Sequence, residues 1–479
     1  MNKTLIVAVG CLALLGACSS TEQADDATVA PTTAAPVATT VATDVTDTVA
    51  DTAPPEATDA PAATEAAPTT EPVPVQGVDG DTVAVGFIIS TNQDVAQAQV
   101  GTTGITFVPH QEIVDALVAE INDNGGLGGK TVVPVIHATD LAVANDPQAI
   151  NREICATFTE DNDVYAVVSI SDPGAEILSC LDEAGVPLIA SSGATFSFAD
   201  QALYDANPLF FDPSAINLDR AATALVEGLD TAGFFEADAK VGVVRLSSPE
   251  FDAATANALE PALAAAGVEP VATAELATIK TNDDIGRFSS EAQAAVLEMK
   301  EAGVTHLVFF ESGGAAPFFL LSAAKDQGFA PKLGFSSLSG GQTLVQNIGT
   351  GGTSVAWSPV GDVPESAQLP ESTEAARCLD LIDSTRAVYT SSNAISETLR
   401  FCDSVWLLQA GVEAAGGAVA AADLAAAIEG LGDSYRSPAA LKSTFGPGKH
   451  DGVSEYYITD YDPTCSCNVY RAGDPTPIG

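Results

Sequence analysis

Lysine and arginine are scarce in this chain of 479 residues. It contains 18 of them against 64 aspartates and glutamates, which gives a formal net charge of −46. Because nucleic-acid binders need clustered basic residues to neutralise phosphates, this balance argues against a nucleic-acid partner. It also disfavours direct binding to anionic lipid headgroups. A charge of this size keeps a protein soluble, and we expect a monomer.

Histidine and the common catalytic motifs are scarce too. The four histidines are far apart, none has the spacing of a zinc-binding HExxH motif, and no serine stands at the centre of a GxSxG motif. Gly126–Thr131 looks like the end of a phosphate-binding loop, but Asn124 occupies the position of its first glycine, and a strand pattern follows. We therefore expect a binding protein with no catalytic residues, metal ligands or cofactor.

The N-terminal apolar run is too short to cross a membrane. Leu5–Leu15 follows Lys3 and falls short of the roughly 20 residues that a bilayer needs, so residues 1–18 are predicted to be a signal peptide. Leu15–Cys18 resembles a bacterial lipobox, in which Cys18 becomes the lipid-modified N-terminus. An ordinary signal peptide with an incidental cysteine is the alternative. We expect an exported protein that is lipid-anchored to the outer face of the cytoplasmic membrane.

Residues 19–80 lack aromatic and basic residues and contain 11 of the acidic ones. Such a segment buries too little apolar surface to offset its ordering entropy, so it is predicted to be a disordered Ala/Thr/Pro-rich acidic linker. The folded part then begins near Asp81 and keeps 53 acidic and 17 basic residues. Most of the negative charge therefore belongs to the folded surface.

Six cysteines follow Cys18, and an even number in an exported chain indicates disulfides. Proximity on consecutive predicted helices favours the pairs Cys155–Cys180 and Cys378–Cys402, although six cysteines allow about 15 pairings. Cys465 and Cys467 would then pair with each other or stay reduced. A CxC metal site is the rival interpretation, but no histidine or cysteine cluster lies nearby in the sequence.

From Asp81 onward, short β-branched runs alternate with longer amphipathic stretches. Thr82–Ile89 has the pattern of a buried strand, and His110–Asn122 places apolar residues on one helical face. A second series of the same kind begins near Lys240, which predicts two α/β lobes, each with a mostly parallel sheet flanked by helices. Helices after Trp357 could return to the first lobe. Such returns make a hinge, and a cleft between hinged lobes is a natural ligand site.

Polar turns follow the predicted strands at the sheet edge where open α/β sheets bind ligands. In the first lobe these turns contain Ser171, Asp172, Gly193, Ala194 and Thr195. Hydroxyls and free amide groups at a helix start are good donors to a carboxylate or amide. Ser171 and Asp172 could instead only cap a helix.

The second lobe has three candidates in equivalent turns, namely Phe251, Glu311 and Ser337. Phe251 could close over an apolar ligand or belong to the core. Glu311 could pair with a cationic group or be a solvated acid at a strand end.

Three segments carry a resemblance to a known family. Asn122–Lys130 looks like the N-x-x-GG-x-x-G element of branched-chain amino-acid-type substrate-binding proteins of ABC transporters, and Asp140 falls where an acidic residue typically follows. Pro187–Thr195 is similar to the P-x-I-S-x-x-A-T turn of that family. Phe251-Asp252 stands where a Tyr-Gly or Phe-Gly pair usually opens a helix.

The resemblance implies a type I periplasmic-binding fold with three hinge crossovers, which closes on a small ligand and presents it to ABC permease subunits. It implies that Ser171, Gly193 and Thr195 hold a ligand carboxylate. Amino-acid binders of the family also hold the ammonium group with an acid after the strand that matches Pro331–Ser337. Ser336–Leu338 contains no acid, which argues against an ordinary α-amino acid.

Our leading hypothesis is an extracytoplasmic receptor for an amino acid, an amide or a similar small organic ligand. Residues 81–212 and 360–445 are expected to form the first lobe, and residues 213–359 and 446–479 the second. A lipoprotein that senses its ligand without transport is the alternative. An extracellular hydrolase is a third reading, which the scattered histidines disfavour.

Overall fold

The computed structural model describes residues 74–99, 106–143, 146–170, 174–193, 199–279, 284–364 and 368–479. Several positions singled out from the sequence lie outside these ranges: Cys18, Ser171, Asp172, Ala194, Thr195 and most of the linker 19–80.

The first sheet has six strands, in the order β1-β2-β4-β5-β6, with β3 paired to β2. All neighbours are parallel except β1 and β2. The β-branched run from Thr82 pairs with β3 over ten residues, from Thr82–Thr131 to Thr91–Asp140. The strands are β1 (Val78–Asp79), β2 (Thr82–Thr91), β3 (Thr131–Asp140), β4 (Ala166–Ser169), β5 (Leu188–Ala190) and β6 (Phe210–Phe211).

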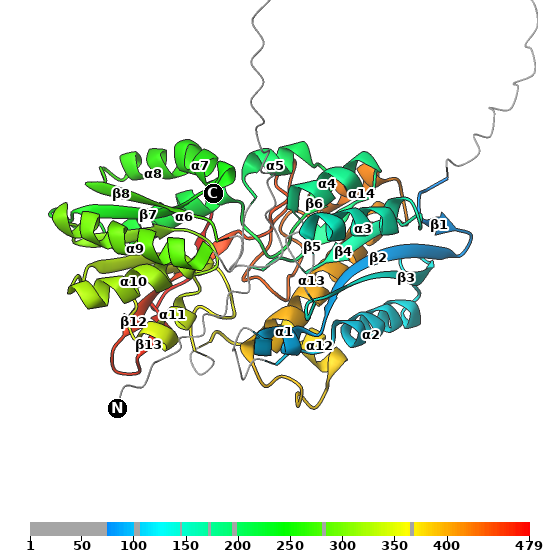
Figure 1. Cartoon of the computed structure of the whole chain (residues 1–479). Coiled ribbons are helices and arrows are strands. Elements are labelled where there is room, and N and C mark those ends of the chain that lie inside the picture. The colour runs from blue at the N-terminus through cyan, green and yellow to red at the C-terminus, as the bar shows by residue number, and fades with distance from the viewer. Residues whose placement is uncertain are drawn as a thin grey trace, which may run out of the picture. The chain divides into compact units, whose positions relative to one another are not determined.

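Helices cover both faces of this sheet, as the parallel pairing requires (Figure 1). One core lies under α2, α12 and α13, and a second lies under α3 and α4. We call this sheet with its helices the first lobe. Its helices are α1 (Gln93–Gln99), α2 (His110–Asp123), α3 (Pro147–Thr159), α4 (Gly174–Glu183), α5 (Gln201–Ala206), α12 (Thr373–Ile382), α13 (Ser392–Ala415) and α14 (Ala421–Glu429).

The second sheet has eight strands in the order β13-β12-β11-β10-β9-β7-β8, with β14 paired to β12. β7 to β11 run parallel, and the late strands join antiparallel. The strands are β7 (Val241–Ser247), β8 (Ala272–Ala277), β9 (His306–Phe310), β10 (Lys332–Ser336), β11 (Thr353–Ala356), β12 (Glu455–Asp462), β13 (Cys467–Tyr470) and β14 (Thr476–Pro477).

The second lobe is this sheet with its own helices, which also cover both faces (Figure 1). They are α6 (Leu218–Thr231), α7 (Pro249–Ala254), α8 (Glu260–Ala265), α9 (Asp284–Glu301), α10 (Ala315–Gln327), the 3₁₀ turn η2 (Ser337–Ser339) and α11 (Gly341–Ile348). A π-helical turn, η1 (Thr255–Leu259), joins α7 to α8.

The apolar pattern of Phe251–Ala266 predicts one regular helix, but the structure interrupts it with this π-helical turn. Pro261 has no N–H to donate to the carbonyl of Asn257, and its ring would clash with that carbonyl in a regular α-helix. A wider turn before the proline removes this conflict.

The structure brings three cysteine pairs to bonding distance. Cys155–Cys180 joins α3 to α4, and Cys378–Cys402 joins α12 to α13, as expected from the sequence. The third pair, Cys465–Cys467, closes a small ring in the turn between β12 and β13. The described part of the chain contains no group of His, Cys, Asp and Glu side chains that could hold a metal ion.

The chain passes between the lobes three times: from β6 to α6, from β11 to α12 and from α14 to β12. The first and third crossovers run side by side, with Asp212 bridged to Asp451. The backbone N–H of Gly452 donates to the Asp212 carbonyl at 2.7 Å, and that of Val453 donates to the Ala215 carbonyl at 3.0 Å. These two segments therefore form one paired ribbon.

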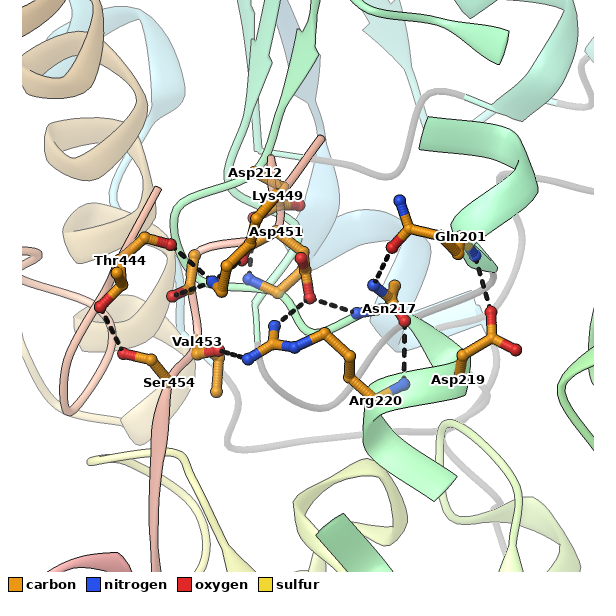
Figure 2. A network of polar contacts seen from close by, with 12 residues as sticks. Gln201, Asp212, Asn217, Asp219, Arg220, Thr444, Lys449, Asp451, Val453 and Ser454 are labelled. Atoms are coloured by element: carbon orange, nitrogen blue, oxygen red, sulfur yellow. Dashed lines mark hydrogen bonds and ion pairs between the residues drawn. The ribbon is translucent and has the colours of Figure 1, made fainter. Parts of the chain in front are cut away.

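Charged side chains fasten this ribbon to the second lobe (Figure 2). The Arg220 guanidinium on α6 forms an ion pair with Asp451 and donates to the Val453 carbonyl at 2.8 Å. The Asn217 backbone N–H donates to the same Asp451 carboxylate at 2.9 Å. Beside them, burial lowers the pKa of Lys449 to about 8, and its ammonium group donates to three backbone carbonyls.

Gly452→Ala should destabilise the paired ribbon. A Cβ at this position would lie 2.1 Å from the Pro213 carbonyl oxygen, so the two crossovers would have to separate. We expect the free energy of unfolding to fall by about 1–3 kcal/mol in chemical denaturation. Gly446→Ala in the neighbouring loop is the matched control, because its Cβ meets no atom within 4 Å. Equal stability of the two variants would contradict the close packing of the crossovers.

Candidate functional site

The carboxyl end of β5 meets the first crossover through short polar contacts. The Ser192 backbone N–H and hydroxyl both donate to an Asp212 carboxylate oxygen, at 3.0 and 2.5 Å. The Gly193 N–H, expected from the resemblance to face a ligand, donates to the Ser214 hydroxyl at 3.1 Å. Gly193 has a φ of 87°, a conformation that favours glycine. Gly193 is thus fixed to the first crossover through Ser214.

Asp403 on α13 is a buried acid behind the same turn that the sequence analysis did not single out. Its carboxylate accepts hydrogen bonds from the hydroxyls of Tyr435 at 2.7 Å and Ser437 at 2.8 Å. Burial raises the pKa of Asp403 to about 7, and the nearby charge of Asp212 adds to the effect. The carboxyl edge of the first sheet is therefore supported by a buried polar cluster.

A second missed group reaches this edge from α13. The Arg400 guanidinium donates to the carbonyl of Ile170, at the end of β4, and to that of Ser192, after β5. On the neighbouring turn of α13, Glu397 accepts a hydrogen bond from the Nε2 atom of His110 at 3.0 Å. The Nδ1 atom of His110 accepts from the Ser90 N–H at 3.0 Å, so this side chain also holds the end of β2.

Glu311 follows β9 at the carboxyl edge of the second sheet. It is buried, with 1% of its surface exposed, so the reading of a solvated strand-end acid is wrong. Its carboxylate accepts a hydrogen bond from the Gly314 N–H at 3.0 Å, just before α10. Burial raises the pKa of this carboxyl group to about 7. A helix start holds the acid in place, but burial disfavours its charge.

Ser337 lies beside a carboxylate from a distant part of the chain. Its hydroxyl donates to Asp362 at 2.6 Å and accepts from the Trp357 N–H at 2.8 Å. Asp362 is buried in the second crossover, and burial raises its pKa to about 7. Its Oδ1 atom finds no hydrogen-bond donor among the described residues. Ser336–Leu338 itself contains no acid, but the Asp362 carboxyl group, which the sequence analysis did not single out, lies beside this turn.

Phe251 belongs to the second-lobe core in this structure. Only 1% of its surface is exposed, and its ring lies edge-on to Phe310 with the centroids 5.1 Å apart. The Ser248 hydroxyl accepts the Phe251 N–H and caps α7. Of the two readings left open for Phe251, this geometry fits the core aromatic.

The fold and the polar sheet edges agree with a comparison against family models. The model described as periplasmic binding protein matches residues 95–466. The chain belongs to this family. It has the type I periplasmic-binding fold, and the family consists of small-ligand receptors that work outside the cytoplasm. A comparison with curated protein sequences gives no match.

Solved structures with the same fold are solute-binding proteins of ABC transporters. One, from Rhodopseudomonas palustris HaA2 in complex with p-hydroxybenzoic acid, has a TM-score of 0.58 and 16% identity over 83% of this chain and 98% of its own. LivJ from Streptococcus pneumoniae, in complex with isoleucine, has a TM-score of 0.54 and 18% identity over 83% and 99%. A fatty acid binder from Thermomonospora curvata has a TM-score of 0.54 and 16% identity over 83% and 92%.

No helix in the described ranges combines the length and apolar character needed to cross a membrane.

The described groups at the two sheet edges are hydroxyls, amides, carboxyls and one guanidinium. The sequence singled out Gly193 and Ser337 but missed Arg400, which contacts Gly193, and Asp362, which accepts from Ser337. It also missed Asp212, which accepts from Ser192. A buried Asp or Arg between apolar residues of a predicted helix or crossover was the available signal.

Proposed function

We propose that this protein is an extracytoplasmic solute-binding receptor that captures a small organic ligand between its lobes and delivers it to an ABC importer. The observation that supports this proposal most directly is that each lobe has a polar carboxyl edge and that three crossovers connect the lobes. In open α/β sheets this edge is where ligands bind. A lipid anchor at Cys18 and the linker 19–80 would tether a monomeric receptor to the membrane.

The contacts that we propose come from both lobes. The first lobe (residues 81–212 and 360–445) would contribute Ser171, Asp172, Gly193, Ala194 and Thr195. The second (residues 213–359 and 446–479) would contribute Glu311 and Ser337. Asp362 lies 2.6 Å from the Ser337 hydroxyl, so a carboxyl group is near the turn where an amino-acid ligand would place its ammonium group. Amino acids therefore stay among the candidate ligands, beside the aromatic acids and fatty acids named for the similar structures.

A thermal-shift screen tests the receptor proposal. The compounds are L-leucine, L-isoleucine, their amides, 4-hydroxybenzoate, 4-hydroxybenzamide and short fatty acids. A compound at 100 times its dissociation constant should raise the free energy of unfolding by about 2.7 kcal/mol. A melting temperature unchanged by this and by a wider panel of small solutes would contradict the proposal.

Ser171→Ala and Thr195→Ala should weaken binding of the best compound from this screen by about two- to tenfold each. The reason is the loss of one hydroxyl hydrogen bond, which contributes about 0.5–1.5 kcal/mol. Titration calorimetry measures the change, and the unfolding temperature of the free protein should stay the same. Thr273→Ala, an exposed position on β8, is the control. Unchanged affinity in both site variants would show that these turns do not hold the ligand.

A further inference from the structure

Arg400 connects the ends of two neighbouring strands in the first lobe. Its Nη1 atom donates to the Ile170 carbonyl at 2.9 Å and to the Ser192 carbonyl at 2.8 Å. Ile170 follows β4 directly, and Ser192 lies two residues after β5. β4 and β5 pair with each other as far as Ser169 and Ala190. The hydrogen bonds of Arg400 join the two segments beyond that last pair. The guanidinium thus continues the link between the two segments beyond the sheet.

The side chain is also held tightly against the backbone that follows β5. A Cβ at Gly193 would lie 3.1 Å from Arg400 Cδ, so the two residues are in close contact. The side chain of Arg400 is 16% exposed, and burial lowers its pKa. A buried cation needs partners that hold it in place, because its desolvation is costly.

Two acids balance the charge of Arg400. Glu397 Oε1 lies 3.8 Å from Nη2, and Asp212 acts on the guanidinium through its charge. Glu397 also binds His110 and Gln93, while Asp212 accepts hydrogen bonds from Ser192. The balance makes Arg400 a poor source of a free positive potential for a ligand. Its two donations from one nitrogen atom, Nη1, to carbonyls on adjacent segments are what distinguish it.

We propose that Arg400 is a positioning residue, which holds the backbone after β4 and the backbone after β5 at the spacing that ligand binding requires. This inference rests on the proposed receptor function. Arginine suits the role because the Nη1 nitrogen of its rigid, planar guanidinium carries two N–H groups in fixed directions, one for each carbonyl, whereas the donors of a lysine ammonium rotate freely. Loss of the link lets Ile170 and Ser192 move independently, while the sheet below them stays paired.

The first experiment needs no ligand. Hydrogen–deuterium exchange is compared between wild type, Arg400→Met and Arg400→Lys for the amides of Ser191, Ser192 and Gly193, which donate to Ser169, Asp212 and Ser214. We expect exchange to rise about tenfold or more in Arg400→Met and less in Arg400→Lys. Amides in the middle of β2, such as that of Phe87, should be unchanged. Unchanged exchange at all three positions would overturn the proposal.

The second experiment separates positioning from a general loss of stability. Leu263→Ala on α8 removes a core side chain of the second lobe that is 3% exposed, and serves as a variant of lowered stability. With 4-hydroxybenzoate and L-leucine as probes, Arg400→Met should lose about ten- to hundredfold in affinity, Arg400→Lys should recover part of it, and Leu263→Ala should stay within twofold. Equal losses in Arg400→Met and Leu263→Ala would overturn the positioning role.

The two proposals fail in different ways. If the wild type binds neither these probes nor any compound of the wider panel, the receptor function fails, and the ligand role of Arg400 fails with it. If the wild type binds a probe and Arg400→Met binds it equally well, only the positioning role fails.

Discussion

Asp451→Ala is expected to lower the free energy of unfolding by about 3–5 kcal/mol, the range measured when one partner of a buried ion pair is removed. The Asp451 side chain is 2% exposed and that of Arg220 is 15% exposed, so water cannot replace the lost carboxylate easily. The substitution also leaves the Asn217 N–H without its acceptor. Arg220 and the buried ammonium group of Lys449 would then face each other without the negative charge between them.

Urea denaturation of the full chain measures this effect. Glu236→Ala is the matched control, because it removes one acid from an ion pair with Lys332 whose side chains are 51% and 56% exposed. Exposed pairs of this kind contribute little to stability, because solvent screens them. Asp451→Asn should fall between the two, since its amide oxygen can still accept. A loss in Asp451→Ala no larger than in the control would mean that the ribbon of paired crossovers is held by its backbone alone.

Asp362→Asn is expected to stabilise the protein by an amount that grows as the pH rises from about 4 to about 7. Burial raises the pKa of Asp362 to about 7 from its usual 3.8, so the folded protein binds a proton that the unfolded chain releases between these values. Stability contributed by the protonated group is therefore lost as the pH rises from about 4 through 7. A pKa difference of about three units lowers the free energy of unfolding at pH 8 by on the order of 4 kcal/mol.

The measurement is the difference in free energy of unfolding between Asp362→Asn and wild type from pH 4 to pH 8. It should be near zero at pH 4 and reach a few kcal/mol in favour of the variant at pH 8. For Asp460→Asn the difference in free energy of unfolding should instead favour the wild type. Burial opposes the charge of Asp460, but the Arg471 guanidinium and the Thr353 hydroxyl outweigh it and lower the pKa of this carboxyl group. Its deficit should be present at pH 8 and disappear as the pH falls below 4. A flat difference for Asp362→Asn would contradict the raised pKa.

Local patterns were sufficient to predict the two α/β series. The apolar run of Thr82–Ile89 and the apolar face of His110–Asn122 each depend on neighbours within one element, and both elements form where expected. The pairs Cys155–Cys180 and Cys378–Cys402 could be predicted for a similar reason, because each pair lies on two consecutive helices. The π-helical turn at Thr255–Leu259 does not follow from the apolar pattern around it, because it depends on the missing N–H of Pro261.

The polar partners at the sheet edges could not be predicted in this way. Ser337 and Asp362 are 25 residues apart, and Ser192 and Arg400 are 208 apart. Each contact depends on how whole elements pack and on where the chain crosses between lobes, and no local period encodes that. Burial determines the protonation of these groups, so the raised pKa of Asp362 could not be predicted from the composition either.

The late position of α13 in the chain has a consequence for synthesis. This helix packs on β4 and β5, yet it begins about 200 residues after β5 ends. A nascent chain that has only reached the second lobe therefore exposes Val168 and Ile189, which α13 and its neighbours bury in the finished protein. The first lobe can be completed only when nearly the whole chain has been made. Folding of the first lobe is therefore delayed until its last helices have been synthesised.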